Sequence, residues 1–336
     1  MNDVRGLSPS SAAVPADPDG SGALAPASRS FAVLVPAFDE APNMPDLFSE
    51  LARTFRSNHL DGEVIVVDDG SSDGTYSAAR EAATAAGLER VQVLRHRLNR
   101  GKTSAIVTGA RATDADVLVL FDADLQHATD EIPRFLDELD SGLDVVTGRK
   151  VGKYDKRFVS GVYNGLAGRL FSVPVRDMNS MKAFRREVLD DLQLREDWHR
   201  YLVVLAHARG WNIGEIDIEL LPRRHGESKY GGRGRIVVGM LDLVAVWFQL
   251  AFSRKPLMFF GVTGLGLLAL GGIVGLVAVW LRFVEGAGFR PLLNLVLLLV
   301  LLGGLLFVAG LIGELVAGLR AEVDELRRDL RHDRRT

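Results

Sequence analysis

The chain has 336 residues and contains no cysteine. Disulfide bonds, thiolate metal sites and cysteine nucleophiles are therefore excluded. An excess of positive charge is also missing: the formal net charge is −3, which gives no electrostatic basis for binding nucleic acid. The first 30 residues lack apolar periodicity, and no basic segment followed by an apolar segment occurs there. We therefore expect a disordered leader over residues 1–30 and not a signal peptide.

Charged residues are almost absent from two long stretches near the other end of the chain. Leu257 to Leu281 and Pro291 to Leu319 are nearly all apolar, and each is long enough to cross about 30 Å of hydrocarbon. Neither stretch has a polar face, which argues against a pair of buried core helices. We predict a transmembrane hairpin over residues 257–319, with glycines suited to close helix contact. These glycines are Gly264, Gly271, Gly272, Gly303 and Gly304.

Basic residues flank both spans and predict their orientation. Arg254 and Lys255 precede the first span, and Arg320 follows the second. The excess of basic residues on cytoplasmic loops places these flanks, and the catalytic domain with them, in the cytoplasm of a multi-pass inner (plasma) membrane protein. Residues 236–256 are predicted to form an interfacial amphipathic helix, with an ordinary core helix as the alternative. The charged tail 320–336 has an apolar stripe that could pair subunits into a homo-oligomer or belong to a single surface helix.

Strand-like and helix-like runs alternate in the part of the chain before these spans. This rhythm predicts an α/β fold with a mainly parallel sheet and helices on both faces, over residues 31–235. The predicted strands are Phe31–Val35, Val64–Val67, Val91–Leu94, Val117–Phe121, Val145–Thr147 and a late strand at Ile213–Leu220. The predicted helices are Met44–Phe55, Thr75–Ala86, Thr103–Ala112 and Asp130–Leu139. Four glycines are expected just beyond strands, where the backbone turns: Gly70, Gly74, Gly101 and Gly148.

Two carboxylates, Asp122 and Asp124, directly follow the apolar strand Val117–Phe121. Side chains at positions i and i+2 of an extended segment point to the same side, so both carboxylates can converge on one cation. Oxygen ligands favour Mg²⁺ or Mn²⁺, and such an ion commonly holds a diphosphate. A solvated turn explains this short pattern equally well when it is considered alone.

Acidic loops also follow the first two predicted strands. Pro36 to Glu40 follow the first strand, and Asp68 and Asp69 follow the second. The carboxyl ends of parallel strands meet at one edge of the sheet, where open α/β sheets bind ligands. Carboxylates there suit ribose hydroxyls and the N–H donors of a base. Asp73 is instead expected to cap the helix that follows it.

Five motifs in a fixed order carry a resemblance to a known family. They read V-P-A-F-D-E, V-D-D-G-S-S-D-G-T, N-R-G-K, D-A-D-L-Q-H and R-H-G-E-S-K. Roughly residues 31–235 resemble family 2 glycosyltransferases of GT-A fold, and within them the polyprenyl-phosphate (dolichol-phosphate) mannose or glucose synthases. The resemblance implies transfer of a hexose from a UDP- or GDP-linked sugar to a polyprenyl or dolichyl monophosphate, with inversion and with Mg²⁺ or Mn²⁺ as cofactor.

The same resemblance implies roles for individual residues. The nucleotide-binding residues would be Pro36, Phe38, Glu40, Val67, Asp68, Asp69, Asp122, Ala123, Arg223 and Lys229. The metal would be held by Asp122, Asp124 and Gln126, and the acceptor phosphate by Arg149, Lys156, Arg157 and Ser160. The residues that would carry catalysis are Asp122, Asp124, Arg149 and Lys229.

The chain departs from the family pattern at three places. Asp39 stands where the family usually has Asn, and Phe38 where Tyr is common. After Asp177 the usual Ser/Thr-Gly-Phe is replaced by the sequence from Asn179 to Phe184.

A lipid phosphate is already anionic at neutral pH, since its second pKa is about 6, and it needs no strong general base. His127 is therefore assigned a supporting or structural role. Two other functions fit the same sequence: a membrane glycosyltransferase that uses a glycolipid or polysaccharide acceptor, and a catalytically silent membrane scaffold.

Overall fold

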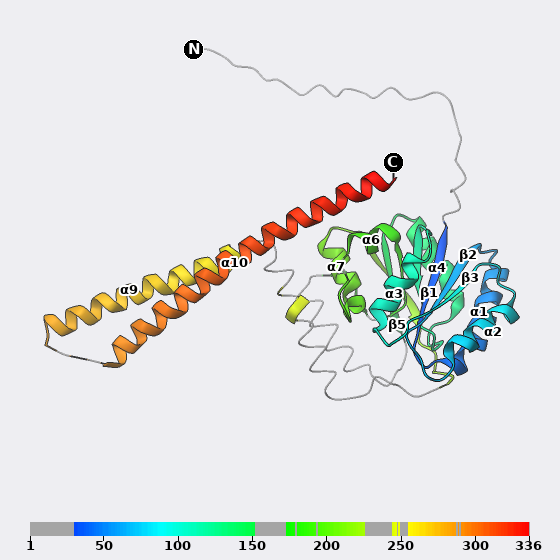
Figure 1. The fold of residues 1–336 in the computed structure, drawn as a ribbon, viewed down its shortest axis with the longest axis horizontal. Coiled ribbons are helices and arrows are strands. Elements are labelled where there is room, and N and C mark those ends of the chain that lie inside the picture. The colour runs from blue at the N-terminus through cyan, green and yellow to red at the C-terminus, as the bar shows by residue number, and fades with distance from the viewer. Residues whose placement is uncertain are drawn as a thin grey trace, which may run out of the picture.

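The computed structural model describes residues 30–151, 173–178, 180–192, 194–225, 244–246, 248, 255–286, 288 and 290–335. Its centre is a seven-stranded sheet in the order β3-β2-β1-β4-β6-β5-β7 (Figure 1). The strands are β1 (Phe31–Ala37), β2 (Gly62–Asp68), β3 (Val91–Arg95), β4 (Val117–Leu120), β5 (Val145–Val151), β6 (Lys182–Arg185) and β7 (Ile213–Glu219). The helices around it are α1 (Met44–Ser57), α2 (Thr75–Ala86), α3 (Lys102–Arg111), α4 (Ile132–Asp140), α6 (Arg186–Asp191) and α7 (Leu202–Ala208).

The sheet is mainly parallel, as the sequence predicts. Strands β2 and β4 pair in parallel with β1, and β5 pairs in parallel with β7. Only β6 among these strands runs the other way, and it pairs antiparallel with both β4 and β5. The carboxyl ends of β1, β2, β4 and β5 therefore lie at one edge of the sheet, together with the start of β6.

Hydrophobic cores cover both faces of the sheet, which explains why the strands are apolar without alternation. One core joins Leu34 and Leu118 to the helices α3 and α7. The other joins Val33 and Val119 to α1, α2 and α4. Successive residues of one strand thus enter opposite cores, as the pleat requires.

The sequence prediction missed one strand and ended another too early. Strand β6 was not predicted, because its four residues Lys182 to Arg185 carry charge at both ends. Strand β5 extends to Val151, so Gly148 and Arg149 lie inside it and not beyond its end. Gly70, Gly74 and Gly101 do lie beyond strands, and all three have positive φ angles.

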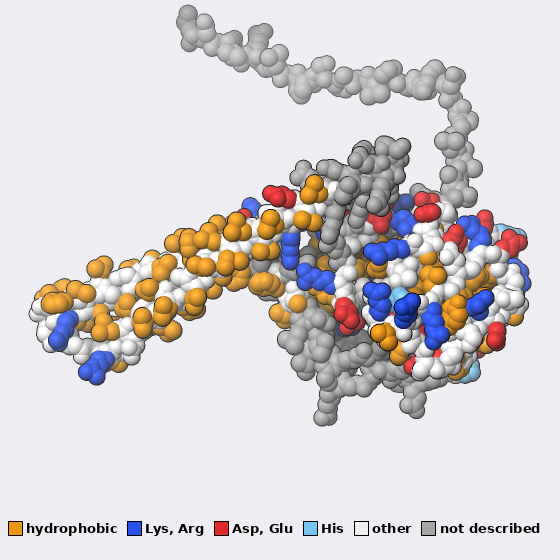
Figure 2. Space-filling view, in the orientation of Figure 1, with side chains coloured by type: hydrophobic (Ala, Val, Ile, Leu, Met, Phe, Trp, Pro, Cys, Tyr) orange, Lys and Arg blue, Asp and Glu red, His pale blue; other side chains and the backbone are white. Residues whose placement is uncertain are grey.

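Two apolar helices follow the α/β part and lie side by side, extending away from it (Figure 1). Helix α9 (Val262–Phe283) continues a π-helical turn at Leu257–Gly261, and α10 spans Arg290–Arg335. The segments Leu257–Phe283 and Arg290–Val323 are long and apolar enough to cross a membrane. Apolar side chains cover the hairpin, and basic side chains gather at its connector (Figure 2).

Glycines allow the two helices to pack closely. A Cβ on Gly264 would lie 2.6 Å from the carbonyl oxygen of Gly303, and one on Gly271 would lie 3.1 Å from Val300 Cγ2. The predicted contacts at Gly264, Gly271 and Gly303 are therefore confirmed. A Cβ on Gly272 or Gly304 would meet nothing within 4 Å, so the prediction for those two glycines was wrong.

Several predicted segments lie outside the described residues. The leader is one of them, apart from Ser30. Most of the predicted interfacial helix is another, although residues 244–246 and 248 are helical. Helix α10 runs through the predicted boundary at residue 320 without a break. The domain limits at residues 235 and 256 stay predictions.

Candidate active site

The acidic loops after β1 and β2 are joined by hydrogen bonds at one edge of the sheet. The backbone N–H of Asp39 donates to Ser71 Oγ (2.8 Å), and Ser72 N–H donates to Asp39 Oδ1 (3.0 Å). Asp39 has a φ of 50°, a left-handed conformation that Asp and Asn tolerate better than most residues. Asp at this position can therefore replace the family's Asn without a change of backbone.

Asp73 bonds the start of α2, although the N-cap residue of this helix is Gly74 and not Asp73 as predicted. Its carboxylate accepts hydrogen bonds from the backbone N–H of Thr75 (3.0 Å) and of Ala41 (3.0 Å). Thr75 Oγ1 in turn accepts from Glu40 N–H (2.8 Å). These bonds satisfy N–H groups at a helix start and tie the first loop to it.

Asp69 organises the N-R-G-K loop. Its buried carboxylate accepts hydrogen bonds from the backbone N–H groups of Arg100 (2.9 Å) and Gly101 (2.8 Å), and it lies 2.7 Å from His96 Nδ1. Gly70 permits this approach, because a Cβ there would lie 2.6 Å from Asn99 N. The loop therefore presents Lys102, the first residue of α3, to the edge of the sheet.

The other predicted nucleotide residues lie at the same edge. Asp68 is fully buried and pairs with Arg95 Nε (3.2 Å), and its Oδ1 accepts from Ser71 N–H (2.9 Å). Pro36 and Val67 face each other in the register of β1 and β2. Glu40 Oε2 accepts a hydrogen bond from Asn43 Nδ2 (2.6 Å). Phe38 directly follows β1.

Lys102 forms an ion pair with Asp122, at 2.5 Å between Nζ and Oδ1. Burial by itself would raise the pKa of Asp122, but the Lys102 ammonium outweighs it and holds that pKa well below its usual value. Asp122 is therefore ionised at neutral pH. The sequence reasoning gave Lys102 no role, although it ends the quoted N-R-G-K motif.

Arg223 contacts the remaining predicted metal ligands. Its NH2 group donates to Asp124 Oδ2 (2.7 Å) and to Gln126 Oε1 (3.3 Å). Burial and the neighbouring Asp122 carboxylate raise the pKa of Asp124, and Arg223 opposes that rise. The oxygens of Asp124 and Gln126 thus converge on a single cationic group.

This donor set suits a hard divalent cation. The ligands would be two carboxylates and one amide oxygen, and Mg²⁺ typically takes few protein ligands and completes its shell with water and substrate phosphates. Within the described part of the chain, no cluster of three or more His, Cys, Asp or Glu residues forms a closed metal cage. The metal assignment to Asp122, Asp124 and Gln126 stays a prediction.

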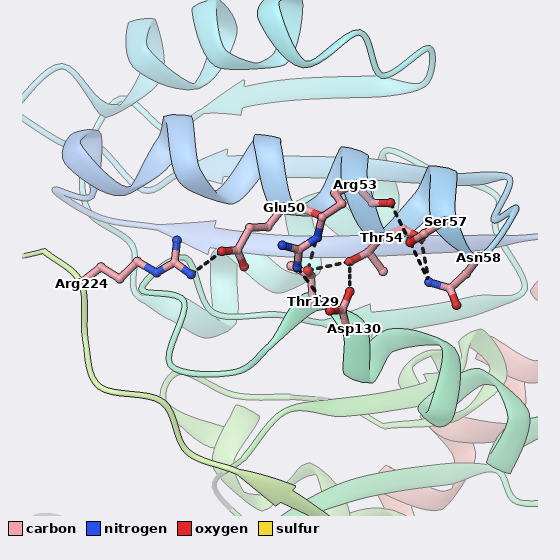
Figure 3. Close-up of polar contacts among 8 residues, drawn as sticks. All are labelled: Glu50, Arg53, Thr54, Ser57, Asn58, Thr129, Asp130 and Arg224. Carbon is pink, nitrogen blue, oxygen red and sulfur yellow. Dashed lines mark hydrogen bonds and ion pairs between the residues drawn. The ribbon is translucent and has the colours of Figure 1, made fainter.

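The segment that carries Arg223 is anchored to α1 (Figure 3). Arg224 forms an ion pair with Glu50 and lies 3.6 Å from Asp46. Helix α1 is bonded in turn to the loop after the metal motif, because Thr54 Oγ1 donates to Asp130 Oδ1 (2.6 Å). The segment that carries Arg223 and the segment that follows Asp124 are therefore both bonded to α1.

Arg149 lies on β5 and is paired with β7. Its Nε and NH2 groups donate to the two carboxylate oxygens of Asp217, at 2.5 and 2.6 Å. This bidentate pair keeps the pKa of Asp217 below its usual value and orients the guanidinium. The other residues predicted around the substrate phosphates lie outside the described residues. They are Lys156, Arg157, Ser160 and Lys229.

Three further titratable side chains lie near Asp122. From the sequence, Lys182 and His199 were assigned no role and His127 only a supporting one. Lys182 is 3 % exposed at the start of β6. Burial lowers its pKa to about 7. His127 is also buried, and burial lowers its pKa to about 4, so its imidazole is neutral at neutral pH. Burial likewise holds the pKa of His199 well below its usual value, and its Nδ1 lies 2.9 Å from Thr103 Oγ1.

Comparison with known proteins places the chain among sugar transferases. The family described as glycosyl transferase family 2 matches residues 32–193. The dodecaprenyl-phosphate galacturonate synthase of Rhizobium johnstonii is 31% identical, over 86% of this chain and 88% of its own length. The undecaprenyl-phosphate 4-deoxy-4-formamido-L-arabinose transferase of Pseudomonas fluorescens Pf0-1 is 28% identical, over 87% of this chain and 86% of its own.

Solved structures support the fold. The glucosyl-3-phosphoglycerate synthase of Mycobacterium tuberculosis in complex with Mg²⁺ and UDP has a TM-score of 0.52 and 20% identity, over 65% of this chain and 80% of that chain. The complex of the same enzyme with Mn²⁺, UDP and phosphoglyceric acid has a TM-score of 0.51. At this identity the likeness concerns the fold alone.

Proposed function

Because this chain belongs to glycosyltransferase family 2, we propose that it transfers a sugar from a UDP- or GDP-linked donor to a polyprenyl monophosphate at the cytoplasmic face of the membrane. The observation that carries the proposal is the convergence of Lys102 and Arg223 on Asp122 and Asp124 at the carboxyl edge of the sheet. Paired carboxylates beside two cations suit a metal-bound diphosphate, and both relatives named above are polyprenyl-phosphate sugar transferases.

The donor would lie across β1, β2 and β4. The loops that hold Phe38, Glu40 and Asp68 would bind its nucleoside, and Asp122, Asp124 and Gln126 would hold Mg²⁺ or Mn²⁺ against its diphosphate. When bound, such an ion neutralises charge on the departing diphosphate. Lys102, Arg223 and Lys229 would add cationic donors on the same side.

The acceptor phosphate would bind beside Arg149, with Lys156, Arg157 and Ser160 completing its site. One of its oxygens attacks the anomeric carbon while the bond to the diphosphate breaks, so a single displacement inverts the anomeric configuration. Because the phosphate is already anionic, no base has to remove a proton. The protein would therefore act through alignment of the two phosphates and through electrostatic stabilisation.

The hairpin would keep this site at the membrane. A polyprenyl tail stays in the bilayer, so the enzyme must meet its phosphate at the headgroup plane. The two apolar helices supply that anchor, and the basic flanks support a cytoplasmic catalytic domain in the inner membrane. The proposed limits are a GT-A domain at 31–235, an interfacial helix at 236–256 and two spans at 257–319.

The test is transfer of label by the purified full chain. It is incubated with undecaprenyl phosphate and Mn²⁺, in separate reactions with radiolabelled UDP-glucose, UDP-galacturonate and GDP-mannose. We expect one donor to give an organic-extractable, mild-acid-labile lipid, and EDTA to abolish the product until metal is restored. Asp124→Asn should lower the rate at least about 100-fold, since it removes a metal ligand.

Asp130→Asn is the matched control. Asp130 follows in the same connection, and its carboxylate is 59% exposed and pairs with Arg53. An Asn there keeps a side-chain oxygen that can accept the hydrogen bond from Thr54 Oγ1. Its replacement should leave the rate within about twofold. Label in a glycolipid or polysaccharide would instead assign a different acceptor. An absence of transfer with every donor, together with no UDP or GDP binding, would favour the silent scaffold.

A further inference from the structure

An apolar stripe runs along α10 past the end of its apolar segment. Leu319, Val323 and Leu326 have exposed fractions of 62, 43 and 62%. Leu330 continues their spacing of 4, 3 and 4 on the same helix. The second apolar segment ends at Val323, so the stripe reaches beyond it into a part of the helix that is otherwise charged. Apolar residues at this spacing are typical of the seam of a coiled coil.

The stripe lies on the face of α10 that points away from α9. In a heptad with Val323 at position a and Leu326 at position d, the residues that contact α9 and the turn before it fall at positions b and f. These residues are Gly303, Phe307 and Gly310. Positions b and f point away from the seam of a coiled coil. A second helix can therefore lie along α10 without displacing α9.

The same heptad positions are apolar and exposed inside the apolar segment. They include Leu298, Leu302, Leu305, Ile312 and Val316. The one carboxylate between Pro291 and Leu319 belongs to Glu314, which falls at position f. Its Oε2 accepts a hydrogen bond from Leu257 N–H (3.2 Å), on the side of α9. The seam is therefore free of charge along the whole apolar segment.

The residue types along the stripe favour two strands. Val316 and Val323 occupy position a, and Leu319 and Leu326 occupy position d. In parallel coiled coils, β-branched residues at a with leucine at d favour a dimer over larger bundles. The stripe therefore predicts one partner helix for each α10.

Charged residues beside the stripe predict the direction of that partner. Arg320, Arg327 and Arg334 fall at position e, and Glu322 and Asp329 fall at position g. In a parallel dimer, a residue at g meets the e residue five positions later on the other copy. Glu322 would then meet Arg327, and Asp329 would meet Arg334. An antiparallel pair would instead place e against e and g against g, so that like charges would meet.

We propose that α10 binds α10 of a second copy of this chain in a parallel two-stranded coiled coil that begins within the apolar segment and extends to Leu330. Two copies anchored in one membrane present α10 in the same direction, which is the direction that the charges at e and g favour. Each α9 lies on the outside of the pair, and both α/β parts lie on the same side of the membrane. This inference goes beyond the proposed function, because it does not depend on the transfer reaction.

The first test is disulfide cross-linking of the purified full chain in detergent, which the absence of native cysteine permits. Leu319→Cys and Leu330→Cys, made as separate variants, place a thiol at each end of the stripe. In a parallel pair in register, each thiol lies beside the same thiol of the other copy, because positions a and d form the seam. After oxidation with copper phenanthroline, most of each variant should run as a disulfide-linked dimer. Arg328→Cys, at position f, is the matched control and should stay a monomer under the same denaturing conditions.

The second test exchanges the charges beside the seam. One variant combines Glu322→Arg with Asp329→Arg, and the other combines Arg327→Glu with Arg334→Glu. Each variant alone would bring like charges together, so its dimer dissociation constant, measured by sedimentation in detergent, should rise at least about tenfold. A mixture of the two variants should recover the affinity of the wild type, since every g residue again meets an opposite charge at e.

The proposal is overturned if Arg328→Cys cross-links as fully as the two seam variants, or if the wild type sediments as a monomer at every concentration. A monomer would make the tail a single surface helix and leave the stripe within the membrane in contact with lipid. A mixture of the charge variants that associates no better than each variant alone would also reject the parallel pairing. Dimers that form as expected in a protein that transfers no sugar would reject the proposed function and leave this inference in place.

Discussion

The carboxylates at this site belong to similar motifs but have different kinds of hydrogen-bond partner. Asp122 and Asp124 meet cationic side chains, Lys102 and Arg223, which can move away without unfolding the backbone. The proposed metal ion would take their place beside the carboxylates. Asp69 meets backbone N–H groups, which cannot move away without unfolding the loop. The sequence pattern alone does not separate these roles, because a carboxylate accepts from either kind of donor.

Asp69→Ala should therefore destabilise the protein. It leaves the buried N–H groups of Arg100 and Gly101 without their acceptor, and we expect a loss of about 2–4 kcal/mol in the free energy of unfolding. Denaturant unfolding in detergent measures it. Asp61→Ala is the control, because the Asp61 side chain is 89% exposed. It loses only an ion pair with Arg90, whose NH1 group lies 3.6 Å from Asp61 Oδ1. Equal stability of the two variants would show that Asp69 does not hold the loop.

Elements of this fold pack through small residues where backbones approach one another. Helices α9 and α10 meet at Gly264 and Gly303, whose positions leave no space for a methyl group. Gly272 follows Gly271 and Gly304 follows Gly303, but a Cβ on either would meet nothing within 4 Å, so both face away from the partner helix. The same residue type therefore has two different roles, decided by its position around the helix.

Gly264→Ala should loosen the hairpin. Its Cβ would lie 2.6 Å from Gly303 O and 2.7 Å from Phe307 N, so the helices must separate, at a cost of about 1–3 kcal/mol. Thermal unfolding in detergent micelles measures the effect. Gly304→Ala has open space and should be neutral or slightly stabilising, because Ala favours helix more than Gly does. A larger loss for Gly304→Ala than for Gly264→Ala would contradict this packing.

At the scale of the whole molecule, the polar edge of the sheet that holds the proposed active site is joined to an apolar helical hairpin. Figure 2 shows mixed charges over the α/β part and apolar side chains over the hairpin. The connector and the flanks of the hairpin lie at opposite ends of its helices (Figure 1). A membrane around the hairpin would therefore separate the connector from the active site.

The absence of native cysteine makes this arrangement testable by labelling in intact cells. Glu285→Cys lies in the connector, and Arg328→Cys lies beyond Val323, where the second apolar segment ends. A membrane-impermeant maleimide should label the first variant in intact cells and the second only after lysis. Labelling of both variants, or of the second alone, would reject the proposed orientation.

Much of the fold follows from local pattern. Six of the seven strands and the helices α1 to α4 were predicted within a few residues, because a two-faced core requires continuous apolar strands and amphipathic helices. Strand β6 was missed because it is short and charged at its ends, and only its pairing with β4 and β5 makes it a strand. The spans were predicted because a bilayer demands long apolar segments whatever their neighbours are.

The sequence by itself determined the class of fold, the apolar helical hairpin and the carboxylates at the edge of the sheet, since each depends on residues that are close along the chain. Tertiary structure alone decided which cations meet those carboxylates. Lys102, Lys182 and Arg223 come from distant segments and lie together only because the strand order brings α3, β6 and the end of β7 to one edge. Charge interactions depend on distance in space, and a sequence pattern does not contain that distance.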